Sequence, residues 1–137
     1  MLKSELIHPH ISAALAGAGH GAKVLIADGN YPLSTRSGPN ADLVYLNLRP
    51  GLPTVTNVLE TILTEIPVEA AEVMAPPDHE PKIFAEFSKL LPDIELQHRD
   101  RFAFYEAAES PEVCLAIATG EERTYANILL TIGVVKS

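Results

Sequence analysis

The sequence is poor in cysteine and in basic residues. Cys114 is the only cysteine, so no disulfide can form within the chain. Its apolar context, "VCLAIAT", favours a buried thiol in a strand over a nucleophile. Ten Lys and Arg residues stand against eighteen Asp and Glu residues, which gives a net charge of −8 without a basic cluster. This balance argues against nucleic acid or an anionic membrane surface as a partner, and it leaves a small neutral ligand easy to accommodate.

Long apolar runs are also missing. No stretch approaches the roughly 20 apolar residues that a membrane-spanning helix needs. The first residues, "MLKSELIHPHIS", lack the apolar core of a signal peptide, so we expect a soluble, cytoplasmic protein that does not act at a membrane. The 137 residues suffice for one hydrophobic core and are too few for two, so a single domain spanning residues 1–137 is expected.

Motifs for metals and nucleotides are absent too. The stretch "GAGHG" follows a predicted helix, whereas a dinucleotide fingerprint follows a strand, and its glycine spacing does not match. His8 and His10 are spaced like a metal-binding pair, but no further ligand with metal-site spacing lies near them. No Ser-centred nucleophile elbow, phosphate-loop lysine or paired cysteine motif is present. We therefore expect no bound metal and no nucleotide cofactor.

Strand-like and helix-like segments alternate along the chain. Val55, Val58, Leu59 and Ile62 recur at helical spacing, and "KVLIAD" is an unbroken apolar run typical of a buried strand. This alternation predicts a layered α/β domain with a mainly parallel or mixed sheet flanked by helices. The expected helices lie within residues 8–21, 52–66, 80–91 and 100–109, and the expected strands cover residues 23–28, 42–48, 68–74, 94–97, 113–119 and 126–134.

Apolar residues are unusually frequent for so small a domain. They make up 47% of the chain, and several predicted strands are apolar on both faces. Part of this surface is expected to be buried by another subunit. The alternative is a well-filled monomeric core.

Two proton-handling side chains flank the predicted strand over residues 23–28. His20 lies between glycines, which leave the imidazole unshielded, and a histidine can both give and take a proton near neutral pH. Asp28 ends the strand, at the edge where open α/β sheets bind ligands. Each residue has a simpler alternative role. His20 could be a solvated loop histidine, and Asp28 could bond its own backbone in the turn "DGNYP".

Two further segments carry side chains suited to a sugar. Tyr125 and Asn127 are two residues apart, so on an extended backbone both would point to the same face. A phenol and a carboxamide each offer donors and acceptors to sugar hydroxyls. Their alternative roles are to start a strand and to cap a turn. Arg101 begins the segment "RFAFYE", whose aromatic residues are expected in the core rather than on a stacking platform.

The order of short motifs adds a family resemblance. "GHG", "DGNYP", "RFAFYE", "ATGE" and "YANILL" follow one another along nearly the whole chain, and this order resembles the ribose pyranase and fucose mutarotase family. The resemblance implies that His20 is the proton donor and that Asp28, Arg101 and the stretch Tyr125, Ala126 and Asn127 contact a free monosaccharide. It also implies that no cofactor is needed.

The resemblance further implies a cofactor-free mutarotase or pyranase, in which His20 is the general acid and base and Tyr125 its counterpart. Arg101 is typical of the fucose branch, because ribose pyranases generally have a histidine at this position. Ala126, in contrast, gives the motif "YAN", which is typical of the ribose branch. We expect a fucose-type enzyme first and a ribose-type enzyme second. The alternative is a non-catalytic sugar-binding accessory or regulatory protein linked to monosaccharide transport.

The predicted strand sets His20 and Asp28 far apart. Six extended residues cover about 20 Å, more than one monosaccharide can bridge. Either the glycine loop folds back over the strand, or the two residues serve one sugar from different subunits. The resemblance implies ring-like homo-oligomers, with a decamer favoured. We therefore expect a site at a subunit interface, where His20 of one chain faces Asp28, Tyr125 and Asn127 of the next.

Overall fold

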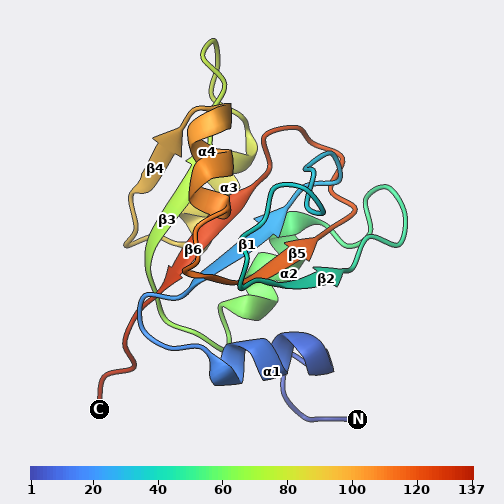
Figure 1. Cartoon of the computed structure of the whole chain (residues 1–137), viewed down its shortest axis with the longest axis vertical. Coiled ribbons are helices and arrows are strands. Elements are labelled where there is room, and N and C mark those ends of the chain that lie inside the picture. The colour runs from blue at the N-terminus through green and yellow to red at the C-terminus, as the bar shows by residue number, and fades with distance from the viewer.

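The chain forms one six-stranded mixed sheet. The strands are β1 (Lys23–Ala27), β2 (Asp42–Tyr45), β3 (Val68–Met74), β4 (Leu96–Arg99), β5 (Val113–Ala118) and β6 (Ile128–Ile132). The structure, a computed structural model, describes residues 1–137. The spatial order is β2-β5-β1-β6-β3-β4 (Figure 1). β6 is antiparallel to its neighbours β1 and β3, and every other pairing is parallel.

Four helices accompany the strands: one precedes β1, and three lie between strands. They are α1 (Pro9–Gly17), α2 (Val55–Ile62), α3 (Ile83–Leu90) and α4 (Arg101–Ala108). Three of them follow a residue whose side chain accepts a backbone N–H of the first turn, which satisfies a group that the helix leaves unpaired. These cap residues are His8, Thr54 and Asp100. None of the four helices is long and apolar enough to cross a membrane. The predicted α/β class, a mixed sheet flanked by helices, is confirmed.

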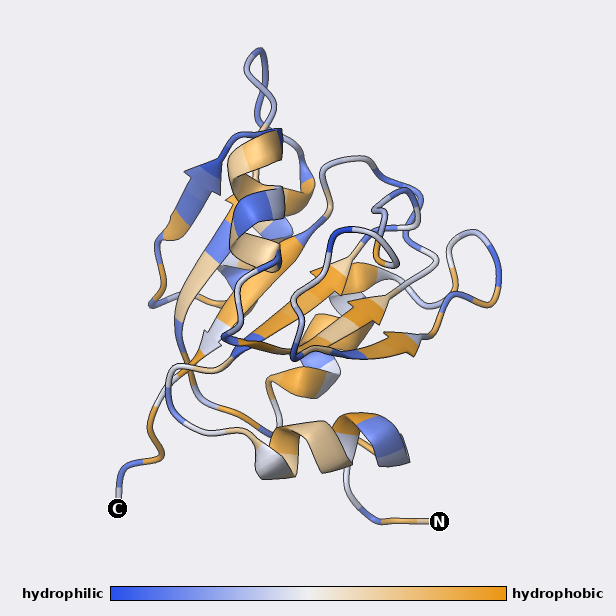
Figure 2. Cartoon of the chain, viewed as in Figure 1, coloured by the Kyte–Doolittle hydropathy of each residue, from blue (hydrophilic) through white to orange (hydrophobic).

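The helices cover the two faces of the sheet unequally. Apolar side chains of α1, α2 and α3 pack on one face in the larger core, and α4 packs on the other face in a smaller one (Figure 1). In β1, Val24 and Ile26 face the larger core, whereas Leu25 and Ala27 face the smaller one. β1 is therefore buried on both faces, as its unbroken apolar run predicts. Figure 2 shows the central strands as hydrophobic and the edge strand β4 as largely hydrophilic.

Several element ends differ from the predicted bounds. The strand expected over residues 42–48 ends at Tyr45. The Leu46 N–H still donates to the Ala118 carbonyl, but the N–H groups of Leu48 and Arg49 donate to the Leu52 carbonyl instead of continuing along β5. The strand expected over residues 126–134 is shortened to β6. Its first residues turn toward Asp28 instead of extending the ladder.

The direction of β6 decides which residues meet. Because β6 runs against the other strands, it starts at the edge of the sheet where they end, which we call the carboxyl edge. Residues after β1 and β5 and residues before β6 gather there. The opposite edge, which we call the amino edge, holds the residues before β1 and β3 and those after β6. Ligands of open α/β sheets bind beyond the carboxyl ends of the strands.

Candidate active site

Asp28 ties together the turn after β1 and the start of β6. Its Oδ1 accepts the backbone N–H of Asn30 at 2.9 Å, which forms the predicted turn. Its Oδ2 accepts the backbone N–H of Ala126 at 3.2 Å. The Asp28 N–H donates to Asn127 Oδ1 at 2.7 Å. The structure thus brings together three of the predicted sugar-contacting residues, Asp28, Ala126 and Asn127.

Asp28 is only 4% exposed. Burial penalises its charged form and raises its pKa above the ordinary 3.8, although the N–H groups of Asn30 and Ala126 partly oppose the shift. The bond from the Asn30 N–H shows that Asp28 has its turn-forming role. The carboxylate can still bind a ligand, because each of its oxygens has a second lone pair that can accept a further hydrogen bond.

Tyr125 has a left-handed backbone with φ of 56°. The extended backbone predicted for residues 125–127 is therefore wrong, and strand alternation does not orient the side chains. Asn127 is buried against Asp28. Of Tyr125 and Asn127, only Tyr125 lines a cavity of about 430 Å³ beside the carboxyl edge. That volume is in the range of sites for small molecules.

Arg101 lines the same cavity from the start of α4, and we call it the Arg101 cavity. Its Nε donates to the Tyr105 hydroxyl at 3.2 Å, and its guanidinium carbon lies 5.4 Å from the centroid of the Phe102 ring. The hydrogen bond to Tyr105 raises the pKa of Arg101. Phe104 and Tyr105 are buried, as predicted for core aromatics. Phe102 is 67% exposed and lines the Arg101 cavity, so the prediction of a core position is wrong for this ring.

His20 lies at the amino edge, away from the other predicted site residues. The N–H of the next residue, Gly21, donates to the carbonyl of Ile132 at the end of β6, at 2.9 Å. The His20 side chain is 57% exposed. Within one chain the glycine loop does not fold back over β1, so His20 and Asp28 stay at opposite ends of the strand.

His20 has a partner that sequence reasoning missed. Its Nε2 lies 2.9 and 3.1 Å from the two carboxylate oxygens of Glu69, near the start of β3. An ionised carboxylate only accepts hydrogen bonds, so Nε2 carries a proton in this contact and Nδ1 points away from Glu69. The residues are 49 positions apart, and no local motif links them.

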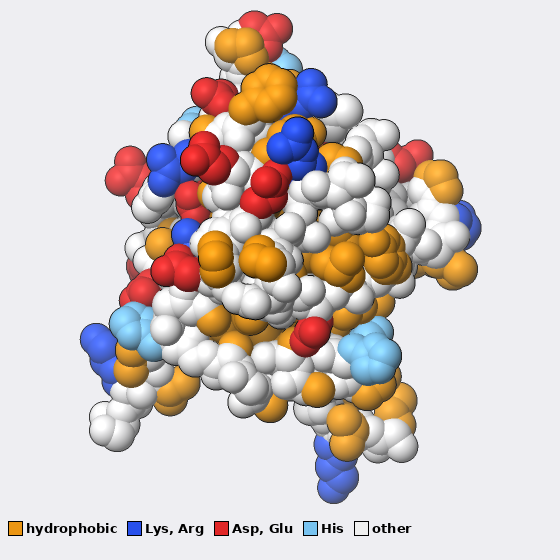
Figure 3. Space-filling model, viewed as in Figure 1, with side chains coloured by type: hydrophobic (Ala, Val, Ile, Leu, Met, Phe, Trp, Pro, Cys, Tyr) orange, Lys and Arg blue, Asp and Glu red, His pale blue; other side chains and the backbone are white.

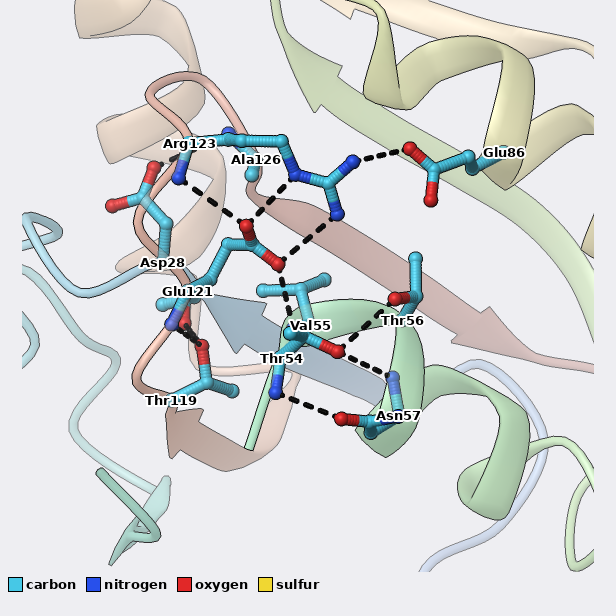
Figure 4. A network of polar contacts seen from close by, with 11 residues as sticks. Asp28, Thr54, Val55, Thr56, Asn57, Glu86, Thr119, Glu121, Arg123 and Ala126 are labelled. Carbon is cyan, nitrogen blue, oxygen red and sulfur yellow. Dashed lines mark hydrogen bonds and ion pairs between the residues drawn. The ribbon is translucent and has the colours of Figure 1, made fainter. Parts of the chain in front are cut away.

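A second missed residue is Glu121, in the segment between β5 and β6. Figure 4 shows its carboxylate at the centre of a polar network that reaches Arg123, the start of α2 and the neighbourhood of Asp28. Glu121 lies in the motif "ATGE", but nothing in the local sequence indicates these contacts. No group of three or more His, Cys, Asp and Glu side chains is arranged to hold a metal ion.

Comparison with known proteins identifies relatives along nearly the whole chain. Residues 1–135 match the RbsD / FucU transport protein family. "D-ribose pyranase 2" of Streptomyces griseus subsp. griseus is 34% identical over 137 residues, with 98% of each chain covered. Bacillus subtilis RbsD complexed with D-ribose is similar with a TM-score of 0.85 at 27% identity, over 99% of this chain and 100% of that one. The fucose mutarotase of Streptococcus pneumoniae in complex with L-fucose gives 0.80 at 26%, over 99% and 100%.

These relatives bear on the predictions from the motif order. They are named as a pyranase and a mutarotase, so the predicted class of enzyme, a sugar isomerase, is confirmed at the level of the family. The predicted family resemblance is confirmed as well, because the family match covers all five motifs from "GHG" to "YANILL". The chain therefore belongs to the RbsD / FucU transport protein family.

Proposed function

We propose that this protein is a cofactor-free mutarotase that interconverts the anomers or ring forms of a free monosaccharide in the cytoplasm. The observation that carries the proposal is the group of residues at the carboxyl edge. Asp28 and Asn127 are hydrogen-bonded there, and Tyr125 and Arg101 line the adjoining cavity. A carboxylate, a carboxamide, a phenol and a guanidinium supply the donors and acceptors that sugar hydroxyls need. The sugars named with the two solved relatives support this substrate class.

The proposed reaction is a pair of proton transfers around the sugar ring. One proton is delivered to the ring oxygen while another leaves the anomeric hydroxyl, so the bond from C1 to the ring oxygen breaks and the C1 carbonyl forms. Rotation of the open chain and the reverse transfers give the other form, with no net change in protons or electrons. His20 gives and takes one of these protons. Tyr125 serves as its counterpart on the other side of the ring.

Glu69 fits this mechanism as the group that orients His20. Its carboxylate accepts from Nε2, so the opposite ring nitrogen, Nδ1, is free to meet the sugar. Asp28, Arg101 and Asn127 are proposed to hold the ring hydroxyls. Ala126 contributes through its backbone, because its N–H sets the position of the Asp28 carboxylate.

The site is proposed to combine two copies of the chain. The five residues of β1 extend over about 17 Å between His20 and Asp28. A sugar that touches both residues therefore needs His20 from a neighbouring copy. Contact between the carboxyl edge of one copy and the amino edge of the next uses two different surfaces, and such contacts close into a ring when the rotation between successive copies closes. We propose that the decamer favoured by the family resemblance is built from contacts of this kind.

Exposed apolar side chains supply surface for that association. Leu43 and Tyr45 on the edge strand β2, and Leu48 and Leu52 in the loop after it, are all exposed. Figure 3 shows further hydrophobic side chains on the surface of the face that carries α4. Burying such surface in a partner copy would stabilise an oligomer.

For the sugar itself, we propose an L-fucose type first and a D-ribose type second. Arg101 occupies the position where the family branches differ, and its fixed fork of donors suits one hydroxyl pattern. The exposed Phe102 ring beside it gives the same cavity an apolar wall, which suits the methyl group of a 6-deoxy sugar. Ala126 supports D-ribose, because it gives the ribose-type motif "YAN".

Saturation-transfer NMR on equilibrated L-fucose and D-ribose tests the proposal. The wild-type protein should accelerate exchange between anomeric signals, whereas His20→Ala should bind sugar with little exchange. Unchanged exchange in His20→Ala would remove His20 from the mechanism. The second candidate, a sugar-binding accessory protein, is favoured by the transport description of the family. It predicts that the wild-type protein binds sugar without accelerating exchange.

A further inference from the structure

Glu121 is a buried carboxylate that the proposed chemistry does not use. It is 3% exposed, in the segment of residues 119–127 that joins β5 to β6. Its Oε2 accepts the backbone N–H of Val55 at 3.2 Å, at the start of α2, and Arg123 Nη2 at 3.2 Å. Its Oε1 accepts the backbone N–H of Arg123 at 3.2 Å and Arg123 Nε at 2.8 Å. Such bonds offset the cost of burying a charge.

The network reaches outward from Glu121 to a second helix. Arg123 also pairs with Glu86 on α3 (Figure 4). Both Arg123 and Glu86 are partly exposed, whereas Glu121 is enclosed. The carboxylate of Glu121 is therefore the interior attachment point of the segment, and Glu86 is an outer contact.

The backbone around Glu121 is attached to the turn that carries Asp28. The N–H of Gly29 donates to the carbonyl of Glu121 at 2.8 Å. The N–H of Glu121 donates to Thr119 Oγ1 at 3.2 Å, and that hydroxyl donates to the carbonyl of Ala27 at 2.7 Å. The same short segment thus contacts the end of β1, the start of α2 and, through Arg123, α3.

Tyr125 and Ala126 follow Glu121 in this segment. The left-handed backbone of Tyr125 is unfavourable for a residue other than glycine, and it persists only where the surrounding structure fixes it. The Ala126 N–H must also point at Asp28. A segment free to move would lose both features, and the side chain that fixes its near end is Glu121.

We propose that Glu121 is a positioning residue for the sugar site, which holds residues 119–127 in the shape that presents Tyr125 and the Ala126 N–H. Glu121 touches neither the sugar nor the reacting atoms. The proposal rests on the proposed function for the identity of the ligand, but the fixed shape of the segment is a property of the free protein.

A positioning role has a distinct kinetic signature. If loosening leaves only a fraction of the molecules with a competent segment, the apparent dissociation constant rises by the inverse of that fraction. Bound sugar selects the competent shape, so kcat changes little. Glu121→Gln should therefore raise KM and the sugar dissociation constant roughly tenfold and leave kcat within about twofold. A purely structural role would lower the melting temperature and leave KM unchanged.

The matched control is Glu86→Gln, which removes the outer carboxylate on Arg123 and leaves Glu121 in place. Its KM should stay within about twofold of the wild-type value. A folded Glu121→Gln with wild-type KM would overturn the proposal. An equal rise of KM in both variants would also overturn it, because Glu86 contacts the segment only through Arg123. If Glu121→Gln does not fold, Arg123→Gln takes its place, with a raised KM expected and an unchanged KM contradicting the proposal.

A second readout separates this proposal from the proposed function. Amide hydrogen exchange of Ala126, measured by NMR without sugar, should be faster in Glu121→Gln than in the wild type and unchanged in Glu86→Gln. If the wild-type protein neither binds nor exchanges sugar, the proposed function fails and the amide measurement still tests the role of Glu121. Unchanged protection of Ala126 in Glu121→Gln would then overturn the role.

Discussion

The backbone N–H of Asp28 donates to the side chain of Asn127 at 2.7 Å, although the residues are 99 positions apart in the chain. The Ala126 N–H returns a bond to the Asp28 carboxylate at 3.2 Å. This exchange joins the end of β1 to the start of β6 in the interior, where unpaired polar groups are costly. Asp28 therefore belongs to one half of the proposed site, and His20, at the amino edge, belongs to the other.

Mixing two inactive variants should restore activity. His20→Ala and Asp28→Asn each disable one half of the site, so rings formed from either alone should be inactive. In an equal random mixture, about a quarter of the interfaces should pair an intact His20 with an intact Asp28. Subunit exchange followed by the NMR exchange assay measures the recovery. The control replaces one parent with the double variant, which should restore nothing. Verified mixed oligomers that stay inactive would contradict a shared site.

Glu69→Gln should lower kcat about tenfold and leave KM within about twofold. An amide holds the imidazole of His20 less firmly than a carboxylate and can present a donor where His20 needs an acceptor. Glu69→Asp, which keeps the charge, should recover part of the loss. Glu60→Gln on the exposed face of α2 is the control for a lost surface carboxylate. A wild-type kcat in Glu69→Gln would show that Glu69 does not orient His20.

Arg101→His should shift preference from L-fucose toward D-ribose. Histidine replaces the guanidinium fork with a single donor and a single acceptor, which fits a different hydroxyl pattern. We expect the ratio of kcat/KM for the two sugars to change about tenfold. Arg36→His is the control, because Arg36 also lies over the Tyr105 ring but is absent from the Arg101 cavity. Equal losses on both sugars would mean that Arg101 is structural.

Glu121 should make stability depend on pH in acid. Burial alone would raise its pKa, but the hydrogen bonds from Arg123 and from the N–H groups of Arg123 and Val55 outweigh burial, so the pKa lies below the ordinary 4.5. The native state therefore binds fewer protons than the unfolded state in this range, and the contribution of Glu121 is lost as pH falls through the lowered pKa. Glu121→Gln should cost about 2 kcal/mol in the free energy of unfolding at pH 7.

Denaturant titrations from pH 7 to pH 3 measure this difference. The gap between wild type and Glu121→Gln should be constant down to the ordinary pKa of 4.5 and should narrow below it. Glu60→Gln, which removes an exposed carboxylate, should follow the wild-type curve. A gap that widens in acid would mean that the carboxylate of Glu121 is not the stabilised form.

The fold could be predicted from local patterns because each element carries its own signal. The spacing of Val58 and Ile62 indicates a helix without knowledge of its neighbours, and the run in β1 indicates a strand buried on both faces. Element ends depended on partners that the pattern does not contain. β2 ends at Tyr45, and the N–H groups of Leu48 and Arg49 bond to the Leu52 carbonyl in the following loop rather than to β5.

The site could be predicted only in part. Asp28 and Asn127 could be predicted as site residues because each lies at the end of a predicted strand. They meet because β6 is antiparallel to β1, which brings the start of β6 beside the end of β1. The left-handed backbone of Tyr125 and the exposure of Phe102 have no local signal. Glu69 could not be found, because its importance comes entirely from His20, which lies 49 positions earlier in the chain.

The central place of β6 has a consequence for synthesis on the ribosome. β2, β5 and β1 form one half of the sheet, β3 and β4 form the other, and only β6 joins them. β6 follows the other five strands along the chain. Before β6 has emerged from the ribosome, the nascent chain contains two half-sheets, and each has an open edge that can pair with other chains. The residues just before β6 therefore take their final positions only when β6 pairs with both halves and those open edges disappear.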